Sequence, residues 1–335
     1  MQEILKKIEQ RNSLTEVEMI SSMKEIMTGK VSEEEIVQFL TLLRDKGETL
    51  EEILGAARVM REFCVTVAVN TDHLVDTCGT GGDSLGTMNL STAAAFVVAG
   101  AGVRVAKHGN RAVSSKSGSA DVLEALGVRI ELEPVQIRRC LQEAGFGFFF
   151  APRFHPAMKN VAAARKKIGT KTLFNLLGPL TNPTLPLYQV IGVYDRKKAI
   201  LLAQVLKALG SHRVLLVNGH DGLDEVTLTG KTSVITLDHQ QIVEWELDPQ
   251  DLDLEYCKPE DLKGRDASYN AMMLKGILEG YESPLRSAIL LNAAAALIAA
   301  GRATSWEEGI AIGEHSLDQG KALQVLKEVV RISNE

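Results

Sequence analysis

Apolar residues recur at helical spacing through the first 65 residues of the chain, and capping signals separate the runs. The clearest run at this spacing consists of Ile36, Phe39, Leu40 and Leu43. Three Ser/Thr-x-x-Glu sequences begin at Thr15, Ser32 and Thr49. In each of them the hydroxyl and the carboxylate can cap the free N–H groups of a helix start. Gly29 and Gly47 stand where the first two of these helices should end, so the region predicts a small all-helical domain.

From residue 74 the pattern changes to short apolar runs that alternate with helical segments. Residues 74–77 predict a strand, residues 91–99 a buried helix and residues 103–106 a second strand. Further short runs predict strands at residues 146–150, 189–193, 214–217 and 233–237. A strand–helix–strand order is typical of parallel strands. The predicted fold class is therefore α/β, with a small all-helical domain and a larger α/β domain whose central sheet is mostly parallel and flanked by helices.

The change of pattern also predicts where the domains divide. We expect the helical domain to occupy residues 1–70 and the α/β domain, which would carry the phosphate-binding loops, to occupy residues 71–335. A segment near residues 160–185 is helical at first and is then interrupted by proline and glycine. We expect this segment to return to the helical domain, although its pattern alone leaves the point open.

Two glycine-rich stretches follow the first two predicted strands. The first covers residues 78–83 (CGTGGD), and the second covers residues 107–121 (KHGNRAVSSKSGSAD). Backbone N–H groups, hydroxyls and a few cations are the groups that hold phosphate. Because ligands gather at the carboxyl ends of parallel strands, both loops are expected to bind one ligand with more than one phosphate. We expect the second loop to be a mobile lid over the phosphates, in preference to a solvated flexible loop.

The first loop does not match the common nucleotide-binding motifs. Ser84 stands where the dinucleotide fingerprint requires its last glycine. Residues 230–232 (GKT) resemble the end of a P-loop, but Glu225 replaces the required upstream glycine. A tight turn without a ligand is the alternative. The sequence NLST at residues 89–92 begins an apolar helix and favours an anion there, although simple N-capping would use the same donors.

Two carboxylates and one arginine are further candidates for binding. Asp224 and Glu225 follow a predicted strand; adjacent carboxylates can hold Mg²⁺ together with waters and substrate phosphates, or can form an acidic surface turn. Arg165 lies in a basic run; its guanidinium can bind a carboxylate, or it can lie on an exposed helix face. His108 and His155 fit either the core or a lid. No residue stands out as a general acid or base.

Composition and charge narrow the class of protein. The chain has 335 residues and a net charge of −6, which speaks against a nucleic-acid surface. Its four cysteines show no paired or metal-ligand spacing, so reduced thiols in a cytoplasmic protein are expected. The first seven residues lack the apolar block of a signal peptide. The apolar runs at residues 93–103 and 293–300 are too short to span a membrane and predict buried helices.

Taken together, these motifs resemble the anthranilate phosphoribosyltransferase family of tryptophan biosynthesis. The resemblance covers nearly the whole chain and is carried by residues 79–83, 89–92, 107–127, 153–158, 174–183 and 222–230. It implies a helical domain packed on an α/β domain and a homodimer formed through the helical part. It also implies Mg²⁺-dependent transfer of phosphoribose from phosphoribosyl pyrophosphate to the amine of anthranilate.

The resemblance assigns the site residues to three groups. The phosphoribosyl donor would contact Gly79, Gly82, Asp83, Thr87, Asn89, Ser91, Thr92, Lys107, Ser115 and Ser119. Mg²⁺ would be held by Ser91, Asp224 and Glu225. Anthranilate would contact Gly79, Asn110 and Arg165, with Arg165 near its carboxylate. The aryl amine is nucleophilic in its neutral form, which agrees with the lack of an obvious general base.

Two other functions are compatible with parts of the sequence. A pyrimidine nucleoside phosphorylase-like enzyme would have similar glycine loops, but it would use inorganic phosphate and would not need Mg²⁺; the Asp224-Glu225 pair favours the transferase. A non-catalytic relative that binds nucleic acid would need a basic groove, against which the net charge of −6 speaks.

Overall fold

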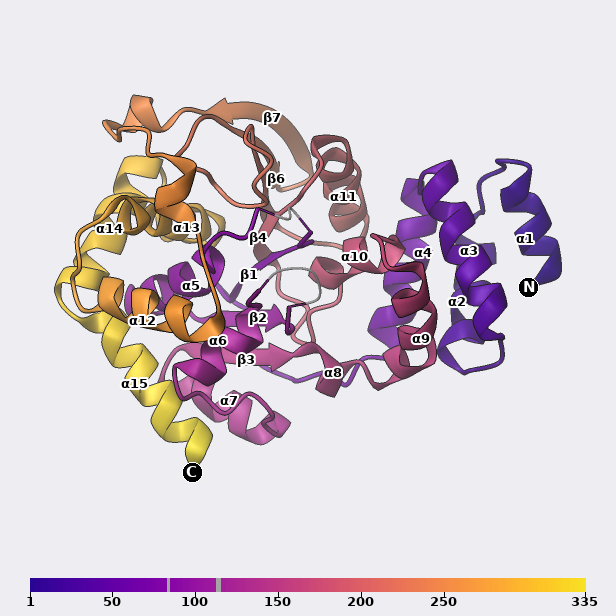
Figure 1. Ribbon diagram of the computed structural model, residues 1–335, viewed down its shortest axis with the longest axis horizontal. Helices are drawn as coiled ribbons and strands as arrows, with labels where there is room; N and C mark the ends of the chain where they lie inside the picture. Colours follow the sequence, from indigo (N-terminus) through magenta and orange to yellow (C-terminus); the bar gives the residue numbers. More distant parts are fainter. Residues whose placement is uncertain (83–84, 113–115) are drawn as a thin grey trace.

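The N-terminal helices form a body of their own beside the rest of the chain (Figure 1). The computed structural model describes residues 1–82, 85–112 and 116–335. The first four helices, called the helical body below, are α1 (Gln2–Glu9), α2 (Glu16–Met27), α3 (Glu33–Lys46) and α4 (Leu50–Glu62). All three predicted capping boxes are confirmed, at Thr15, Ser32 and Thr49. Each cap contributes about 1 kcal/mol to helix stability.

The predicted helix ends in this body are also confirmed. Gly29 follows α2 with φ +72°, and Gly47 is the residue after α3 with φ +89°. These left-handed conformations favour glycine, because other residues place Cβ too close to the backbone.

A single seven-stranded sheet forms the centre of the larger body. Its strands are β1 (Val75–Gly79), β2 (Val105–Gly109), β3 (Phe146–Phe150), β4 (Tyr188–Gly192), β5 (Arg213–Gly219), β6 (Thr232–Asp238) and β7 (Gln241–Leu247). The strand order is β3-β2-β1-β4-β5-β6-β7. Strands β1 to β5 are parallel, and β6 and β7 are antiparallel. The mostly parallel sheet is therefore confirmed, and six of its strands lie where the apolar runs predicted them.

Most of the remaining helices cover the two faces of this sheet, whereas α9 (Lys159–Ile168) and α10 (Leu173–Leu177) lie beside the helical body (Figure 1). The others before the C-terminal group are α5 (Leu90–Gly100), α6 (Ser119–Ala125), α7 (Pro134–Glu143), α8 (Ala151–Phe154) and α11 (Arg196–Ala208). The C-terminal helices are α12 (Ala267–Leu278), α13 (Pro284–Ala299), α14 (Trp306–Asp318) and α15 (Lys321–Asn334). No helix in the described part of the chain is long and apolar enough to cross a bilayer.

Two apolar cores hold these layers together. One core joins the first face of the sheet to α5, α13 and α15, where Phe96 stacks on Phe146 with ring centroids 4.6 Å apart. Helix α5 is apolar on all sides because it is buried on all sides. The other core joins the second face of the sheet to α11 and continues into the helical body. Full burial of each large apolar side chain contributes about 1.5–3 kcal/mol.

The segment after β3 leaves the sheet and lies against the helical body. Helix α9 packs on α2 and α3, and α10 packs on α3 and α4. The Asn160 amide donates to the main-chain oxygen of Met27 (2.7 Å), and Arg61 of α4 donates to the oxygen of Leu180 (2.7 Å). These bonds link α9 and the turn after α10 to the helical body; the domain division at residue 70 stays a prediction.

Candidate functional site

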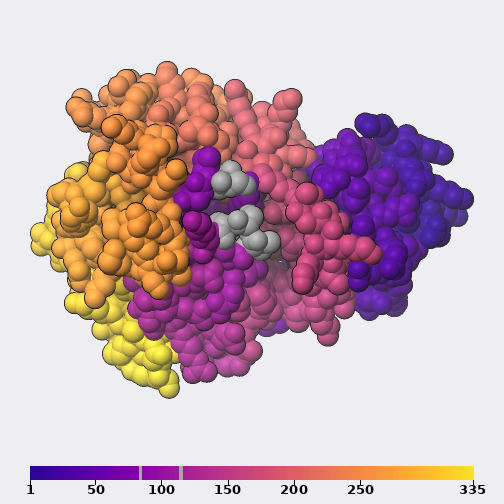
Figure 2. Space-filling view, viewed as in Figure 1, coloured from indigo at the N-terminus to yellow at the C-terminus, as the bar shows by residue number. Residues whose placement is uncertain are grey.

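The two glycine loops leave neighbouring strands at the same edge of the sheet. Strand β1 ends at Gly79 and β2 ends at Gly109. Gly81 and Gly82 have φ values of +65° and +87°, a backbone conformation that favours glycine. A Cβ at Gly79 would lie 3.1 Å from Asp224 Oδ2, so the missing side chain lets the acidic turn approach the loop. Figure 2 shows that the surface is hollowed between these loops and the α9–α10 segment.

A cavity of about 220 Å³ lies beneath the loops and is called the polar cavity here. Of the residues predicted to bind the donor or the metal, it is lined by Gly79, Gly82, Thr87, Asn89, Ser91, Thr92, Lys107, Ser119, Asp224 and Glu225. The other two predicted residues, Asp83 and Ser115, lie outside the described residues. The cavity thus brings together residues from four separate parts of the chain.

The start of α5 forms one wall of the polar cavity. The main-chain N–H of Ser91 donates to Glu225 Oε1 at 3.1 Å, so an anion already lies at this helix N-terminus. Asn89 makes no side-chain capping bond, so simple capping is the wrong interpretation of this residue. Instead, its amide donates to the oxygen of Ser117 (3.2 Å) and accepts from Asn270 (3.0 Å), linking the second loop to α12.

Lys107 supplies a buried cation beside this wall. Its side chain is almost fully buried (2 % exposed), and its ammonium donates to the main-chain oxygen of Thr77 and to Ser91 Oγ (3.2 Å). Burial lowers the pKa of Lys107, while the carboxylates of Asp76, Glu225 and Asp224 raise it. The ammonium is therefore held in place before any ligand binds.

The donor set of the polar cavity fits Mg²⁺. Asp224 and Glu225 bring carboxylate oxygens to the same cavity as the Ser91 hydroxyl, and Mg²⁺ prefers such hard oxygen ligands. Among the described residues no three His, Cys, Asp or Glu side chains cluster as a metal site. A two-carboxylate site of this kind is typical of Mg²⁺, which keeps waters and binds substrate phosphates.

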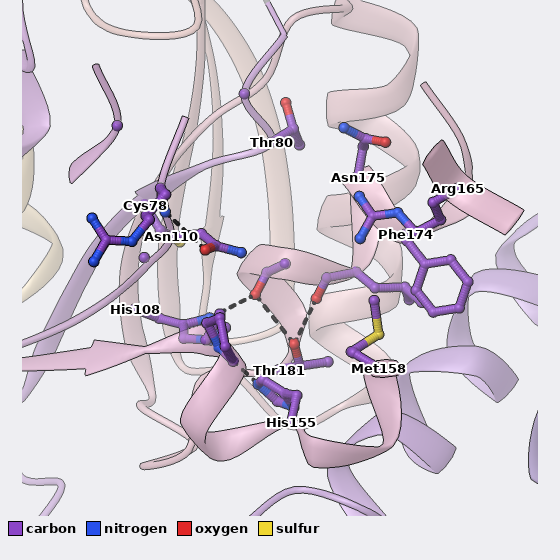
Figure 3. A pocket seen from close by; sticks show the side chains of 18 of the residues that line it. Cys78, Thr80, His108, Asn110, His155, Met158, Arg165, Phe174, Asn175 and Thr181 are labelled. Atoms are coloured by element: carbon purple, nitrogen blue, oxygen red, sulfur yellow. Dashed lines mark hydrogen bonds between the residues drawn. The ribbon is translucent and has the colours of Figure 1, made fainter. Parts of the chain in front are cut away.

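A second cavity, of about 630 Å³, extends from the same loops to α9 and α10 and is called the aromatic cavity here (Figure 3). It is lined by all three residues predicted to bind anthranilate, Gly79, Asn110 and Arg165. Gly79 and Asn110 line both cavities. The two spaces therefore meet at these residues.

Among the described residues, three cationic residues line the aromatic cavity, namely Arg111, Lys159 and Arg165. Arg111 is paired with Asp121 and Glu124, whereas Arg165 is not paired in this way. The Arg165 guanidinium lies 5.5 Å from the centre of the Phe174 ring, and it forms no ion pair with any residue that the structure describes. Burial lowers its pKa. Arg165 points into the cavity (Figure 3), so the alternative of an exposed basic helix face is wrong for this residue. An arginine without a carboxylate partner in a largely apolar cavity can bind the carboxylate of a ligand.

A histidine pair forms another wall. His108 Nδ1 lies 3.1 Å from the oxygen of Gly178, and the Nε2 atoms of His108 and His155 are 3.2 Å apart. Burial lowers the pKa of His108 to about 3 and that of His155 to about 4. Both rings are neutral at pH 7: His108 donates through Nδ1 to Gly178 and accepts at Nε2 from His155. The pair fixes the wall without adding charge.

Sequence reasoning missed much of this wall. Residues 174–183 carry the family resemblance, but the resemblance gives neither Phe174 nor Thr181 a role in a site, and the sequence leaves His108 and His155 open between core and lid. They line the cavity because α9 and α10 pack on the helical body while the turn after α10 lies against β2. The only local sign of this wall in the sequence was an aromatic residue, Phe174, shortly after a basic helix.

The chain is similar to known proteins over its whole length. Residues 2–64 match the helical bundle domain, and residues 71–323 the α/β domain, of a glycosyl transferase family. It is 48% identical over 335 residues to the anthranilate phosphoribosyltransferase of Alkaliphilus metalliredigens, covering 100% of this chain and 99% of the relative. It is 50% identical over 334 residues to that of Bradyrhizobium sp. strain BTAi1, covering 100% and 99%. The chain therefore belongs to the anthranilate phosphoribosyltransferase family.

Solved structures of similar proteins share the fold. The anthranilate phosphoribosyltransferase of Thermus thermophilus superposes with a TM-score of 0.93 at 41% identity, covering 99% of each chain. The Saccharomyces cerevisiae protein in complex with PRPP and Mg superposes with a TM-score of 0.91 at 29% identity, covering 99% of this chain and 97% of that one.

Proposed function

We propose that this protein transfers the phosphoribosyl group of phosphoribosyl pyrophosphate to the amine of anthranilate, giving N-(5-phosphoribosyl)anthranilate and pyrophosphate, in tryptophan biosynthesis. The observation that carries the proposal is the meeting of the two cavities at Gly79 and Asn110. One cavity presents N–H groups, a lysine and two carboxylates, and the other presents aromatic and apolar walls with Arg165, which has no carboxylate partner among the described residues. A phosphorylated donor and an aromatic acid would thus be held side by side.

The polar cavity supplies the donor site. The phosphoribosyl donor would contact Gly79, Gly82, Thr87, Asn89, Ser91, Thr92, Lys107 and Ser119, together with Asp83 and Ser115 outside the described residues. Ser91, Asp224 and Glu225 would hold Mg²⁺, which supplies positive charge to the pyrophosphate when bound. The S. cerevisiae relative bound to PRPP and Mg supports this assignment.

The aromatic cavity supplies the acceptor site. Arg165 would bind the anthranilate carboxylate, and Asn110 with Gly79 would lie where the amine meets the sugar. The neutral His108–His155 pair would hold the ring edge without competing for the carboxylate. The S. cerevisiae relative in complex with 4-fluoroanthranilate supports an aminobenzoate ligand in this family.

The reaction needs charge stabilisation more than proton transfer. As the bond from the sugar carbon to the pyrophosphate oxygen breaks, the sugar gains oxocarbenium character and the pyrophosphate gains negative charge. Lys107 and the N–H groups of the first loop and of α5 stabilise that charge. The amine, held in line by the walls of the aromatic cavity, then forms the new C–N bond and loses one proton, which the departing pyrophosphate can accept.

We also propose that the protein is a cytoplasmic homodimer formed through the helical body. Val17 of α2 is 75 % exposed, an apolar side chain that a partner helix could cover. All four cysteines are free thiols, as a reducing compartment requires. Light scattering coupled to size exclusion should give twice the chain mass, and a lower mass for Val17→Lys.

The first experiment is a fluorescence assay. Anthranilate fluorescence should fall when phosphoribosyl pyrophosphate and enzyme are mixed, and the fall should require Mg²⁺. Phosphorolysis of thymidine is measured alongside. Phosphorolysis without the fluorescence change would favour the nucleoside phosphorylase alternative and contradict the proposal.

A further inference from the structure

Strands β1 and β2 lie side by side in the sheet, but their main chains are barely paired. Strand β1 pairs with β4 at five positions, and β2 pairs with β3 at five positions. Between β1 and β2 the only register pair within the described residues is Val75↔Val105. The strands thus meet at their starts and lose direct pairing as they approach the two cavities.

Side chains take the place of the missing main-chain bonds. Lys107 donates from β2 to the main-chain oxygen of Thr77 on β1. Asn182 donates to the main-chain oxygen of Ala106 at 2.8 Å. Asp76 Oδ1 accepts the main-chain N–H of His108 at 3.2 Å. The separation of β1 and β2 is therefore set by three polar side chains.

Asp76 is the unusual member of this set. Its side chain is fully buried (0 % exposed), and its Oδ2 has no hydrogen-bond partner among the described residues. Burial raises the pKa of Asp76, while the Asn182 amide, the Lys107 charge and the His108 N–H oppose that rise. Asp76 lines neither cavity, so it is not placed to touch a substrate. An uninterrupted parallel pair would satisfy the same N–H with a carbonyl and no buried carboxyl group, so stability alone does not explain this residue.

The peptide group that donates this hydrogen bond to Asp76 joins residues of the two cavities. That N–H belongs to the peptide linking Lys107 to His108. Lys107 lines the polar cavity, and the His108 ring forms the wall of the aromatic cavity through Gly178 and His155. One carboxyl group therefore fixes the main chain between a cation of one cavity and a wall of the other.

We propose that Asp76 is a positioning residue for the transfer reaction. By holding the Lys107–His108 peptide, it fixes the position of the polar cavity relative to the aromatic cavity, so that the amine faces the sugar carbon. This inference rests on the proposed function. Its signature is a loss in turnover without a matching loss of either binding site, because each cavity persists while their relative placement changes.

The test compares wild type with Asp76→Ala and Asp76→Asn. For Asp76→Ala we expect kcat to fall about 100-fold, the size of effect that a shift of about 1 Å in reactant placement produces. Asp76→Asn keeps an oxygen acceptor for the His108 N–H and should lose less, a partial rescue. The KM for each substrate should change by less than about threefold, in keeping with a loss of orientation and not of binding. Calorimetry with phosphoribosyl pyrophosphate and Mg²⁺ should still titrate one site per chain.

A matched control separates positioning from stability. Asp318→Asn weakens a different pair, between the exposed Asp318 and the buried Arg286 (2.7 Å), away from both cavities, and should lower the melting temperature without lowering kcat. The inference would be overturned if kcat stayed within about threefold of wild type in Asp76→Asn and in any folded Asp76→Ala. It would also be overturned if the fall in kcat equalled the fraction of binding sites lost. If Asp76→Ala does not fold, the near-isosteric Asp76→Asn decides alone. An inactive wild type would overturn the proposed function and this inference with it, whereas an active wild type with unaffected variants overturns only this inference.

Discussion

The polar and aromatic cavities differ in how their charged groups are satisfied. In the polar cavity Ser91, Lys107 and Glu225 already bond to one another or to the main chain. In the aromatic cavity Arg165 contacts the Phe174 ring and has no ion pair within the described part of the chain, and the neighbouring histidines are neutral. A network that is bonded in advance can stabilise a transition state with little reorganisation, whereas a lone cation mainly selects which ligand binds. The difference predicts that damage to this charged network affects turnover and that loss of Arg165 affects affinity.

The largest effect is expected from removing the charge of the acidic turn. Asp224→Asn combined with Glu225→Gln should lower kcat about 100- to 1,000-fold and weaken the Mg²⁺ dependence, because the variant would no longer hold the Mg²⁺ that offsets the charge of the pyrophosphate. The melting temperature should change little. Steady-state rates across a Mg²⁺ titration measure this.

The control for that double variant is Asp251→Asn with Glu255→Gln. This exposed pair has the same change in charge and should behave as wild type. Unchanged Mg²⁺-dependent kinetics in the Asp224 and Glu225 variant would contradict the metal assignment.

A smaller effect is expected in the aromatic cavity. Arg165→Ala should raise the KM for anthranilate about 30-fold, the range for loss of a charge-assisted hydrogen bond, while the KM for the donor changes little. Lys166→Ala, which removes an exposed neighbour on α9, is the matched control. Equal changes in the two KM values would argue against a carboxylate contact.

A third test addresses the backbone of the first loop. Gly82→Ala places a Cβ 2.6 Å from Lys171 Cε at a φ of +87°, and should raise the KM for the donor about 10-fold through loop strain. Gly102 has nearly the same φ, +88°, with no atom within 4 Å, and lines neither cavity. Gly102→Ala should therefore cost stability but leave the KM unchanged; an equal effect from both would contradict the proposed donor contact at Gly82.

The smallest effect concerns pH. Because burial holds the pKa of His108 at about 3 and of His155 at about 4, neither ring titrates between pH 6 and 8, and the KM for anthranilate should stay within about twofold. An inflection near the ordinary histidine pKa of about 6.5 would contradict neutral rings.

His108 and His155 also predict the direction in which the stability of the protein changes with pH. Their folded pKa values lie below the unfolded value of about 6.5, so the unfolded chain binds more protons below that pH. The stabilisation that comes from keeping these two rings neutral should be complete above about pH 6.5. The free energy of unfolding should therefore fall as the pH drops from about 6.5 toward 4. Urea titrations at pH 7 and 5 measure this, and a higher stability at pH 5 would contradict it.

The polar cavity could be predicted from the sequence because its chemistry lies in contiguous stretches that follow apolar strands. The placement of residues such as Lys107 and Asp224 could be predicted because the carboxyl ends of parallel strands lie at one edge of a sheet. The aromatic wall could not be predicted in the same way, because Phe174 meets Arg165 only after α9 and α10 fold back on the helical body. The roles of all these residues stay predictions that the substitutions above test.

Two features of the sheet were also not predicted from the apolar runs in the sequence. Strand β7 was missed because the strand predictions rested on short apolar runs; its residues, QIVEWEL, largely alternate apolar and charged side chains on an exposed antiparallel edge, a pattern that could have identified it. The gap between β1 and β2 was missed because pairing between strands depends on side chains such as Asp76 and Asn182, which lie far apart in the chain. Local patterns carry no signal for such long-range bonds.

The packing of α9 on the helical body has a practical consequence for enzyme design. Met158, Ala162 and Phe174 line the aromatic cavity from this segment, whereas the phosphate loops belong to the sheet. The choice of aromatic amine can thus be altered on one scaffold element while the leaving-group chemistry stays on another. A library restricted to these three positions would explore new acceptors without rebuilding the part of the enzyme that activates the sugar.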